Sequence, residues 1–213
     1  MESVRKGKGL PDGAEQEMIN AGVPDWYIGS CKKIKYLFPK AHAVAYVMMA
    51  FRIAWFKVYH PLAFYAAYFY RRSQKGGFDA GLMTCGLEGV KANIEAIENN
   101  EDATDKDEDL LTTLEVAYEY YLRGFEFLPI DIYKSEATKF VVEDGKLRPP
   151  FVSVSGLGEN AALDIVKGRK GQKFLSIEEF TAACPKVSKT HIQMLKDAGA
   201  FGDLPDTSQV SLF

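Results

Sequence analysis

Three residues that follow a proline have the types and spacing expected of a phosphate-binding site. Pro39 cannot continue a preceding helix, and the helix-compatible run 41–60 follows it, so Lys40 and His42 fall in a new first turn or just before it. The unpaired N–H groups and the positive dipole end of such a terminus attract anions, and Lys40 adds a full charge. His42 and Tyr46, four residues apart, share one helix face.

Further lysines lie just upstream of this turn. With Lys40 they place four positive charges within nine positions, a density suited to a nucleotide triphosphate or a nucleic-acid backbone. The alternative is a solvated helix face, with His42 and Tyr46 as ordinary packing residues. Composition leaves both interpretations open for the lysines concerned, Lys32, Lys33 and Lys35.

A second candidate site is the glycine-containing turn within residues 151–166. Ser155, Gly156 and Gly158 precede a helical pattern. A hairpin that presses its N–H groups onto a phosphate needs a conformational freedom and a close approach that a Cβ would obstruct. The alternative is an ordinary glycine turn before a helix. Three basic residues follow that helix and are expected to contact the same strand: Lys167, Arg169 and Lys170.

A degenerate counterpart of this turn and helix occupies residues 187–201, although the chain shows no internal repeat at a fixed period. We expect His191, which lies within it, to be structural and not catalytic. The chain then finishes on two apolar side chains, Leu212 and Phe213. They either fold back onto the core or dock into a hydrophobic pocket of a partner.

Length and charge are those of a soluble globular protein with one or two domains: 213 residues, 47% hydrophobic and 26% charged. The net charge of -3 conceals an uneven distribution. Residues 1–75 carry 12 Lys and Arg against 5 Asp and Glu, residues 76–145 carry 5 against 17, and residues 146–213 carry 9 against 7. The two ends are therefore suited to a polyanion, with plain solvated surface as the alternative.

Several classes of protein are disfavoured. Cys31, Cys85 and Cys184 are widely spaced, which indicates neither a zinc site nor a disulfide framework and fits a reducing cytoplasm. Charged residues and a proline interrupt the apolar run 41–70 before about 20 clean apolar residues accumulate, so we expect buried helices. Met1 is followed by charged and glycine-rich residues, so we expect no signal peptide and a start within a domain.

The remaining pattern predicts a mainly helical chain with one small β-hairpin. The hairpin is expected at 137–143 and 146–148, around the turn pair Asp144-Gly145, and an acidic loop at 99–109. The expected helices are 13–21, 24–38, 40–60, 62–72, 82–98 and 108–123, with 62–72 apolar all round and therefore buried among its neighbours.

Five segments resemble, in the same order, the bacterial family C replicative DNA polymerases, most closely the PolC type. The segment 31–46 is similar to the fingers of that family, and nearly the whole chain is covered, least clearly between 74 and 109. The other segments are 6–12, 23–27, 156–162 and 209–213.

This resemblance implies a helical fingers segment followed by a tandem helix-hairpin-helix DNA-binding domain. The implied regions are the end of the fingers at 1–75, a helical scaffold at 76–130, a duplex-binding domain at 131–204 and a clamp-binding tail at 205–213. Lys40, His42 and Tyr46 would contact the incoming nucleotide and the nearby lysines its phosphates or DNA. The hairpin would hold the duplex backbone. The tail resembles the sliding-clamp motif in Gln209, Val210, Ser211, Leu212 and Phe213.

Two-metal nucleotidyl transfer needs a carboxylate cluster, and none is placed for it in this sequence. The resemblance puts the catalytic aspartates and their Mg²⁺ in a palm domain before Met1, so the chain alone is expected to be inactive and to bind no cofactor. Its expected partners are primer–template duplex, the incoming deoxynucleotide and the sliding clamp, in the cytoplasm and without a membrane. The alternatives are a non-enzymatic DNA-binding adaptor that recruits the clamp, and a helical membrane-associated protein built on 41–70.

Overall fold

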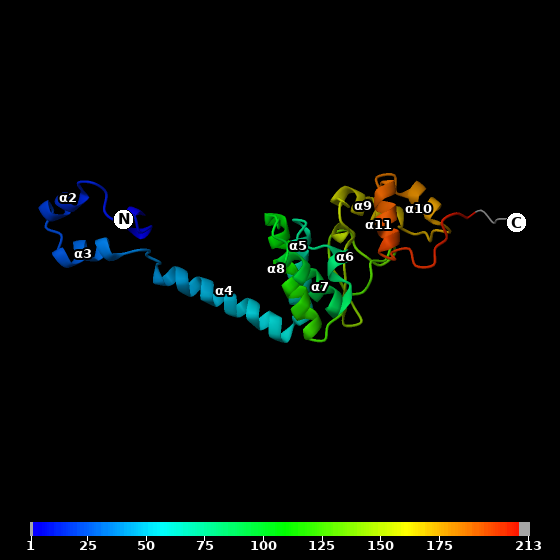
Figure 1. Ribbon diagram of the computed structural model, residues 1–213, viewed down its shortest axis with the longest axis horizontal. Coiled ribbons are helices and arrows are strands. Elements are labelled where there is room, and N and C mark those ends of the chain that lie inside the picture. Colours follow the sequence, from blue (N-terminus) through cyan, green and yellow to red (C-terminus); the bar gives the residue numbers. More distant parts are fainter. Residues whose placement is uncertain (1, 209–213) are drawn as a thin grey trace. The chain divides into compact units, whose positions relative to one another are not determined.

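The computed structural model describes residues 2–208 and forms two compact units, with the boundary between Trp55 and Phe56 (Figure 1). The described residues form eleven α-helices, one 3-10 helix and a single two-stranded antiparallel sheet. The prediction of a mainly α fold with a small β-hairpin is therefore confirmed. The functional boundaries at 75, 130 and 204 stay predictions.

The first unit is built from short helices and loops around a small core. Val4, Ile28 and Cys31 are its buried apolar residues. The amide of Leu37 donates to the carbonyl of Arg5 over 2.9 Å. A Cβ on Gly7 would lie 1.9 Å from the carbonyl oxygen of Lys35, so only glycine allows this approach. The elements of the unit are α1 (Glu2–Arg5), α2 (Ala14–Asn20), α3 (Asp25–Lys33) and most of α4 (Lys40–Tyr59).

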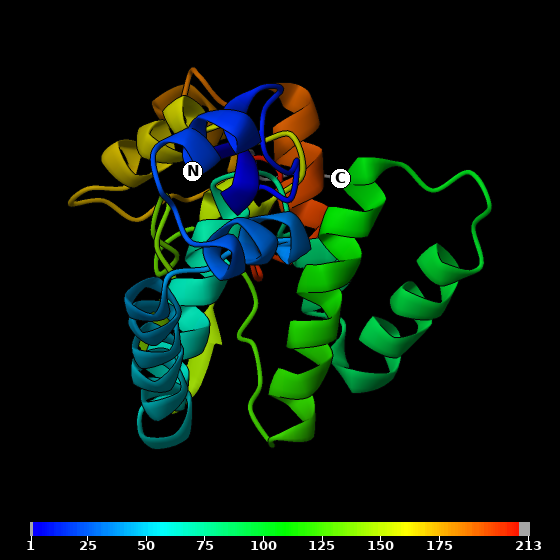
Figure 2. The ribbon, with the colours of Figure 1, turned by 90° about the vertical axis from the view of Figure 1, so that its left-hand side faces the viewer.

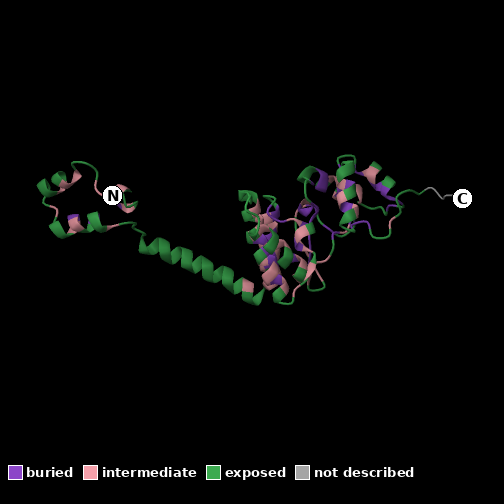
Figure 3. Cartoon of the chain, in the orientation of Figure 1, coloured by how far each residue is buried: buried purple, intermediate pink, exposed green. Residues whose placement is uncertain are grey.

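Helix α4 begins at Lys40, as the proline predicts, but its environment differs from the prediction. None of its residues is buried (Figure 3), whereas its apolar composition predicted a buried helix. The apolar composition of a helix indicates that burial would stabilise it, but it does not identify the segment that packs against it. Among the described residues, α4 is the one helix long and apolar enough to cross a membrane by length and composition alone.

The second unit starts with a layer of helices, of which α7 and α8 pack side by side (Figure 2). Helix α5 buries a single stripe, Tyr65, Phe69 and Ser73, and not its whole circumference as predicted. Tyr65 meets Tyr120 of α8 edge to face, with ring centroids 5.0 Å apart. The helices are α5 (Pro61–Ser73), α6 (Ala80–Met83), α7 (Gly86–Glu98) and α8 (Asp105–Leu122).

Several predicted boundaries move for local reasons. The expected helix 82–98 is two helices, because the chain turns at Gly86, which has a φ of 82°. The acidic loop ends at Thr104, which forms a capping box with Asp107 at the start of α8. That carboxylate accepts from the backbone and hydroxyl of Thr104, which lowers the pKa of Asp107. Helix α3 ends at Lys33, five residues before the predicted end.

The β-hairpin is shorter than predicted, with strands β1 (Val141–Glu143) and β2 (Lys146–Arg148). Asp144 and Gly145 both have positive φ, 51° and 76°, as a type I′ turn requires. Lys134 and Arg148 both donate to Glu143, and these hydrogen bonds lower the pKa of that carboxyl group.

The chain then forms two consecutive helical pairs, η1 (Phe151–Ser153) with α9 (Glu159–Gly168), and α10 (Ile177–Ala183) with α11 (Lys189–Asp197). Buried residues recur at an offset of thirty positions between them: Val154, Leu157 and Ile165 correspond to Cys184, Val187 and Leu195. The structure thus shows a fixed offset that the sequence conceals. One hydrophobic cluster extends from Tyr65 to Phe201, so both pairs belong to the core of the second unit.

Candidate nucleic-acid interface

The first hairpin joins η1 to α9 through a tight turn. The amide of Leu157 donates to the carbonyl of Val154 over 3.0 Å, and Gly156 has a φ of 74°, the value that the third residue of a type II turn needs. Leu157 is only 3% exposed and anchors the turn to the core, whereas Ser155, Gly156 and Gly158 are exposed. The backbone therefore faces solvent on one side.

This exposed backbone carries a row of free donors. Within the described part of the chain, the amides of Gly156, Gly158, Glu159 and Asn160 have no hydrogen-bond partner. The last three belong to the N-cap and first turn of α9, where the helix dipole favours an anion. A Cβ on Gly156 or Gly158 would meet no atom of the protein within 4 Å, so both positions leave space for a ligand to approach the backbone.

The second hairpin, between α10 and α11, has the same outline but different chemistry. Its turn closes with the amide of Val187 on the carbonyl of Cys184 over 3.0 Å. The amide of Lys186 donates to Asp164 of α9 over 2.9 Å, and the amide of Ser188 donates to the imidazole Nδ1 of His191 over 3.3 Å. The counterparts of the free amides of Gly156 and Gly158 are therefore used inside the protein in the second hairpin.

The predicted basic contacts differ in their surroundings. Lys167 lies in the last turn of α9, not after the helix as predicted, and Lys170 lies two residues beyond the helix end; both are exposed. Arg169 is turned inward: its guanidinium donates to the carbonyls of Ile132 and Ser135 over 2.9 and 2.6 Å, and its side chain is 11% exposed. Burial lowers the pKa of Arg169 from its usual value. We therefore leave Arg169 out of the interface proposed below.

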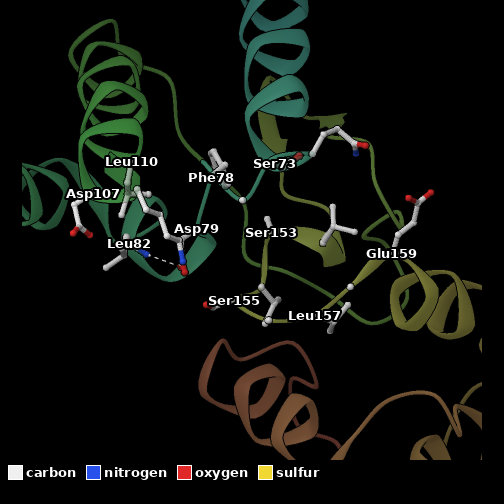
Figure 4. Close-up of a pocket in the computed structure, with 17 residues that line it drawn as sticks. Ser73, Phe78, Asp79, Leu82, Asp107, Leu110, Ser153, Ser155, Leu157 and Glu159 are labelled. Carbon is white, nitrogen blue, oxygen red and sulfur yellow. Dashed lines mark hydrogen bonds between the residues drawn. The ribbon is translucent and has the colours of Figure 1, made fainter. Parts of the chain in front are cut away.

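A pocket of about 510 Å³ lies between the first hairpin and α5, α6 and α8 (Figure 4), and Ser155, Gly156 and Gly158 form part of its lining. Its lining includes three carboxylates, Asp79, Asp107 and Glu159, against a single lysine, Lys106. Asp79 already caps α6 by accepting from the amide of Gly81 over 2.8 Å. This excess of negative charge disfavours a phosphate deep inside the pocket, among these three carboxylates.

The first unit brings the other predicted residues together at the start of α4. The rings of Phe38, His42 and Tyr46 form a row, with centroids 4.6 and 4.4 Å apart, on the face predicted from their spacing. Lys40 occupies the first position of the helix. All of these side chains are exposed. The row supplies aromatic faces beside a positive helix terminus, an arrangement that suits a base and its phosphates.

The upstream lysines are not equivalent. Lys32, Lys33 and Lys35 are all exposed, but Lys32 forms an ion pair with Glu15 over 2.6 Å. Lys8, which the sequence did not single out, is exposed one residue after the close approach of Gly7 to Lys35. Lys8 could have been identified from the glycines on either side of it, which indicate a turn or loop at this position.

Two further lysines were missed in the second hairpin. Lys186 and Lys189 are exposed there, thirty positions after Gly156 and Glu159.

Burial raises the pKa of the neighbouring Cys184 thiol to about 11. The described residues contain no group of three or more His, Cys, Asp or Glu side chains able to hold a metal ion. The predicted clamp-binding residues Gln209, Val210, Ser211, Leu212 and Phe213 lie outside the described residues.

Comparison with known proteins found a motif family that matches the region of both hairpins and several proteins that are similar to the whole chain. Residues 124–210 match the helix-hairpin-helix motif family. The whole chain is similar to the PolC-type DNA polymerase III of Bacillus cereus and Bacillus subtilis, at 52% identity over 214 residues, and to that of Thermotoga maritima at 50% over 215. It spans about 15% of the length of each of these relatives.

Proposed function

We propose that this chain is the C-terminal portion of a PolC-like, DNA-directed DNA polymerase and that its first hairpin binds the primer–template duplex. The proposal rests on the combination of about 50% identity along the whole chain with an exposed glycine hairpin inside the matched helix-hairpin-helix region, four of whose amides have no partner among residues 2–208. The parent enzyme would transfer nucleotides with Mg²⁺ held by palm carboxylates outside these residues.

Binding at the hairpin depends on the backbone. The amides of Gly156, Gly158 and Glu159 would donate to phosphate oxygens, which are ionised acceptors and form stronger hydrogen bonds than neutral ones. Lys167 and Lys170 would add charge along the same strand. Contacts of this kind position a duplex without reading its bases, so affinity is expected to depend little on sequence and steeply on salt.

The start of α4 would serve the incoming deoxynucleotide. Lys40 and the helix terminus would contact its phosphates, with His42 and Tyr46 beside it, and Lys32, Lys33 and Lys35 would contact those phosphates or nearby DNA. The support is the row of rings at 4.6 and 4.4 Å and the exposed lysines next to it. Among these lysines, and within residues 2–208, the one with an acidic partner is Lys32, and its partner Glu15 would compete with a phosphate for its charge.

The tail would attach the polymerase to the sliding clamp in the cytoplasm. Gln209 would hydrogen-bond the clamp, and Leu212 and Phe213 would fill its pocket, with Val210 and Ser211 between them. A short tethered motif keeps its partner close by raising the effective concentration. Calorimetry of the chain with the clamp, with and without 209–213, tests this part: micromolar binding, about -8 kcal/mol, should vanish on truncation.

The DNA-binding proposal is tested by fluorescence anisotropy of the intact chain with a labelled primer–template duplex over a series of salt concentrations. We expect the logarithm of the affinity to fall linearly with the logarithm of the salt concentration, and the affinity to differ little between duplexes of two unrelated sequences. Gly158→Val is the matched variant, since Gly158 has an ordinary φ of -73° and free space around it. Unchanged affinity for this variant, or no duplex binding by the wild type, would contradict the proposal.

The alternative of a free-standing adaptor that recruits the clamp shares the hairpin and the tail with the proposal. The two differ at the start of α4, because an adaptor would not bind an incoming deoxynucleotide there. Photo-crosslinking with an azido-deoxynucleotide triphosphate in the presence of primer–template separates the two. Label on the segment 32–46 that Lys40→Ala removes supports the polymerase; no label there, with intact clamp binding, supports the adaptor.

A further inference from the structure

A contact between the two helical pairs identifies a residue that controls the shape of the first hairpin. The imidazole Nε2 of His191, on α11, lies 3.0 Å from the carbonyl oxygen of Gly156. A carbonyl oxygen can only accept, so Nε2 must carry the proton. Nδ1 in turn accepts from the amide of Ser188, which is consistent with a neutral ring protonated at Nε2.

This contact completes the restraint of one peptide group. The carbonyl of Gly156 is held by His191, and the amide of the same peptide, on Leu157, is held by the carbonyl of Val154 over 3.0 Å. Because a peptide group is planar, fixing its oxygen and its hydrogen fixes its orientation. The amides of Gly156 and Gly158, which have no partner among the described residues, belong to the two adjoining peptide groups, so this restraint limits their orientation as well.

Little else holds this part of the hairpin. Gly156 is exposed, and no protein atom lies within 4 Å of the position that its Cβ would take. Glycine in a turn is the most permissive residue for the backbone, so the turn needs an external restraint to stay in one conformation. Leu157 supplies one by its burial, and His191 supplies the other from a helix that lies 35 positions away in the sequence.

We propose that His191 is a positioning residue for phosphate binding by the first hairpin, and that the second hairpin supports the first instead of forming an equivalent phosphate clamp. The proposal rests on the DNA-binding function proposed above. The reciprocal contact agrees with it, because the amide of Lys186 in the second hairpin donates to Asp164 of α9. The second pair uses its polar groups to hold the first.

Three variants of the intact chain test this inference by duplex affinity and thermal midpoint. His191→Gln keeps an acceptor for Ser188 and a donor for Gly156, and should bind duplex within about twofold of the wild type. His191→Glu keeps the capping box, for which Glu is the usual third residue, but has no donor for Gly156. It should retain its thermal midpoint and lose about fivefold in affinity, the range of one neutral hydrogen bond.

Thr190→Glu is the control for the added charge, since it places the same charge on the neighbouring exposed position of α11. The difference in affinity between the His191→Glu and Thr190→Glu variants should persist at higher salt, where a purely electrostatic difference is screened. Equal affinities for these two variants, or a loss in His191→Gln as large as in His191→Glu, would overturn the inference.

A spectroscopic measurement on the wild type keeps the test independent of any variant that fails to fold. A long-range ¹H–¹⁵N spectrum should show His191 protonated at Nε2, and addition of duplex should shift the amide of Leu157. Protonation at Nδ1 alone would remove the donor and overturn the inference. If the wild type fails to bind duplex, the proposed function fails; if it binds and only the His191 variants behave alike, the inference alone fails.

Discussion

The two hairpins of the second unit share an outline and differ in what their backbone amides do. In the first, the amides around Gly158 are free within the described residues; in the second, the corresponding amides of Lys186 and Ser188 bind Asp164 and His191. The difference teaches that a duplicated motif need not be duplicated in function. The first hairpin presents these donors to solvent, whereas the second uses one to contact α9 and the other to orient His191.

The largest effect is expected from removing the glycines of the first hairpin together. Gly156→Val with Gly158→Val should weaken duplex binding about 100-fold, because a Cβ blocks two charge-assisted hydrogen bonds of about 1.5 kcal/mol each. Anisotropy titrations at fixed salt measure this. Gly158→Val alone, which introduces no backbone strain, is the matched control and should account for about tenfold. An affinity that survives the double change would mean that this hairpin does not face DNA.

Arg169 should affect stability and not DNA binding. Arg169→Ala leaves the buried carbonyls of Ile132 and Ser135 without a donor and should cost about 2 kcal/mol of unfolding free energy. Urea unfolding measures the loss, and the salt dependence of duplex binding should keep its slope. A reduced slope with unchanged stability would return Arg169 to the interface.

Lys167 and Lys170 should show the opposite pattern. Replacing both with alanine should lower the slope of log affinity against log salt by about 2 and weaken binding about tenfold, because two phosphate contacts are lost. The unfolding free energy should change little, since both side chains are exposed. Lys173→Ala, an exposed lysine beyond α9, serves as the control. An unaltered slope in the double variant would place DNA elsewhere on the unit.

The smallest effect is expected in the second hairpin. Ser188 accepts from the amide of His191 over 3.3 Å as the N-cap of α11, so Ser188→Ala should cost about 1 kcal/mol of stability. Its own amide, which orients His191, remains in alanine. Duplex affinity should therefore stay within about twofold of the wild type. A loss comparable to that of Gly158→Val would show that both hairpins bind DNA and would break the comparison.

Local rules predicted much of this architecture. Proline and glycine positions indicated the start of α4 and the turn at Gly156, and the Asp144-Gly145 pair marked the β-hairpin. The spacing of His42 and Tyr46 predicted their shared face, and their rings lie 4.4 Å apart. These features depend on residues close in sequence, for which backbone geometry is decisive.

What could not be predicted depends on partners far along the chain. Arg169 resembles any basic residue after a helix until the carbonyls of Ile132 and Ser135 are placed around it. His191 contacts Gly156 across 35 positions, and no local pattern reports that. The exposure of α4 could not be predicted for the same reason, since its apolar composition indicates that burial would be favourable and does not show whether another segment packs against it.

The most direct test of the central claim is an amide ¹H–¹⁵N titration of the intact chain with a primer–template duplex. The account predicts saturable shifts for the amides of Gly156, Gly158, Glu159 and Asn160, with small changes for Lys186 and Ser188. Equal shifts in both hairpins, or shifts confined to the second, would contradict it.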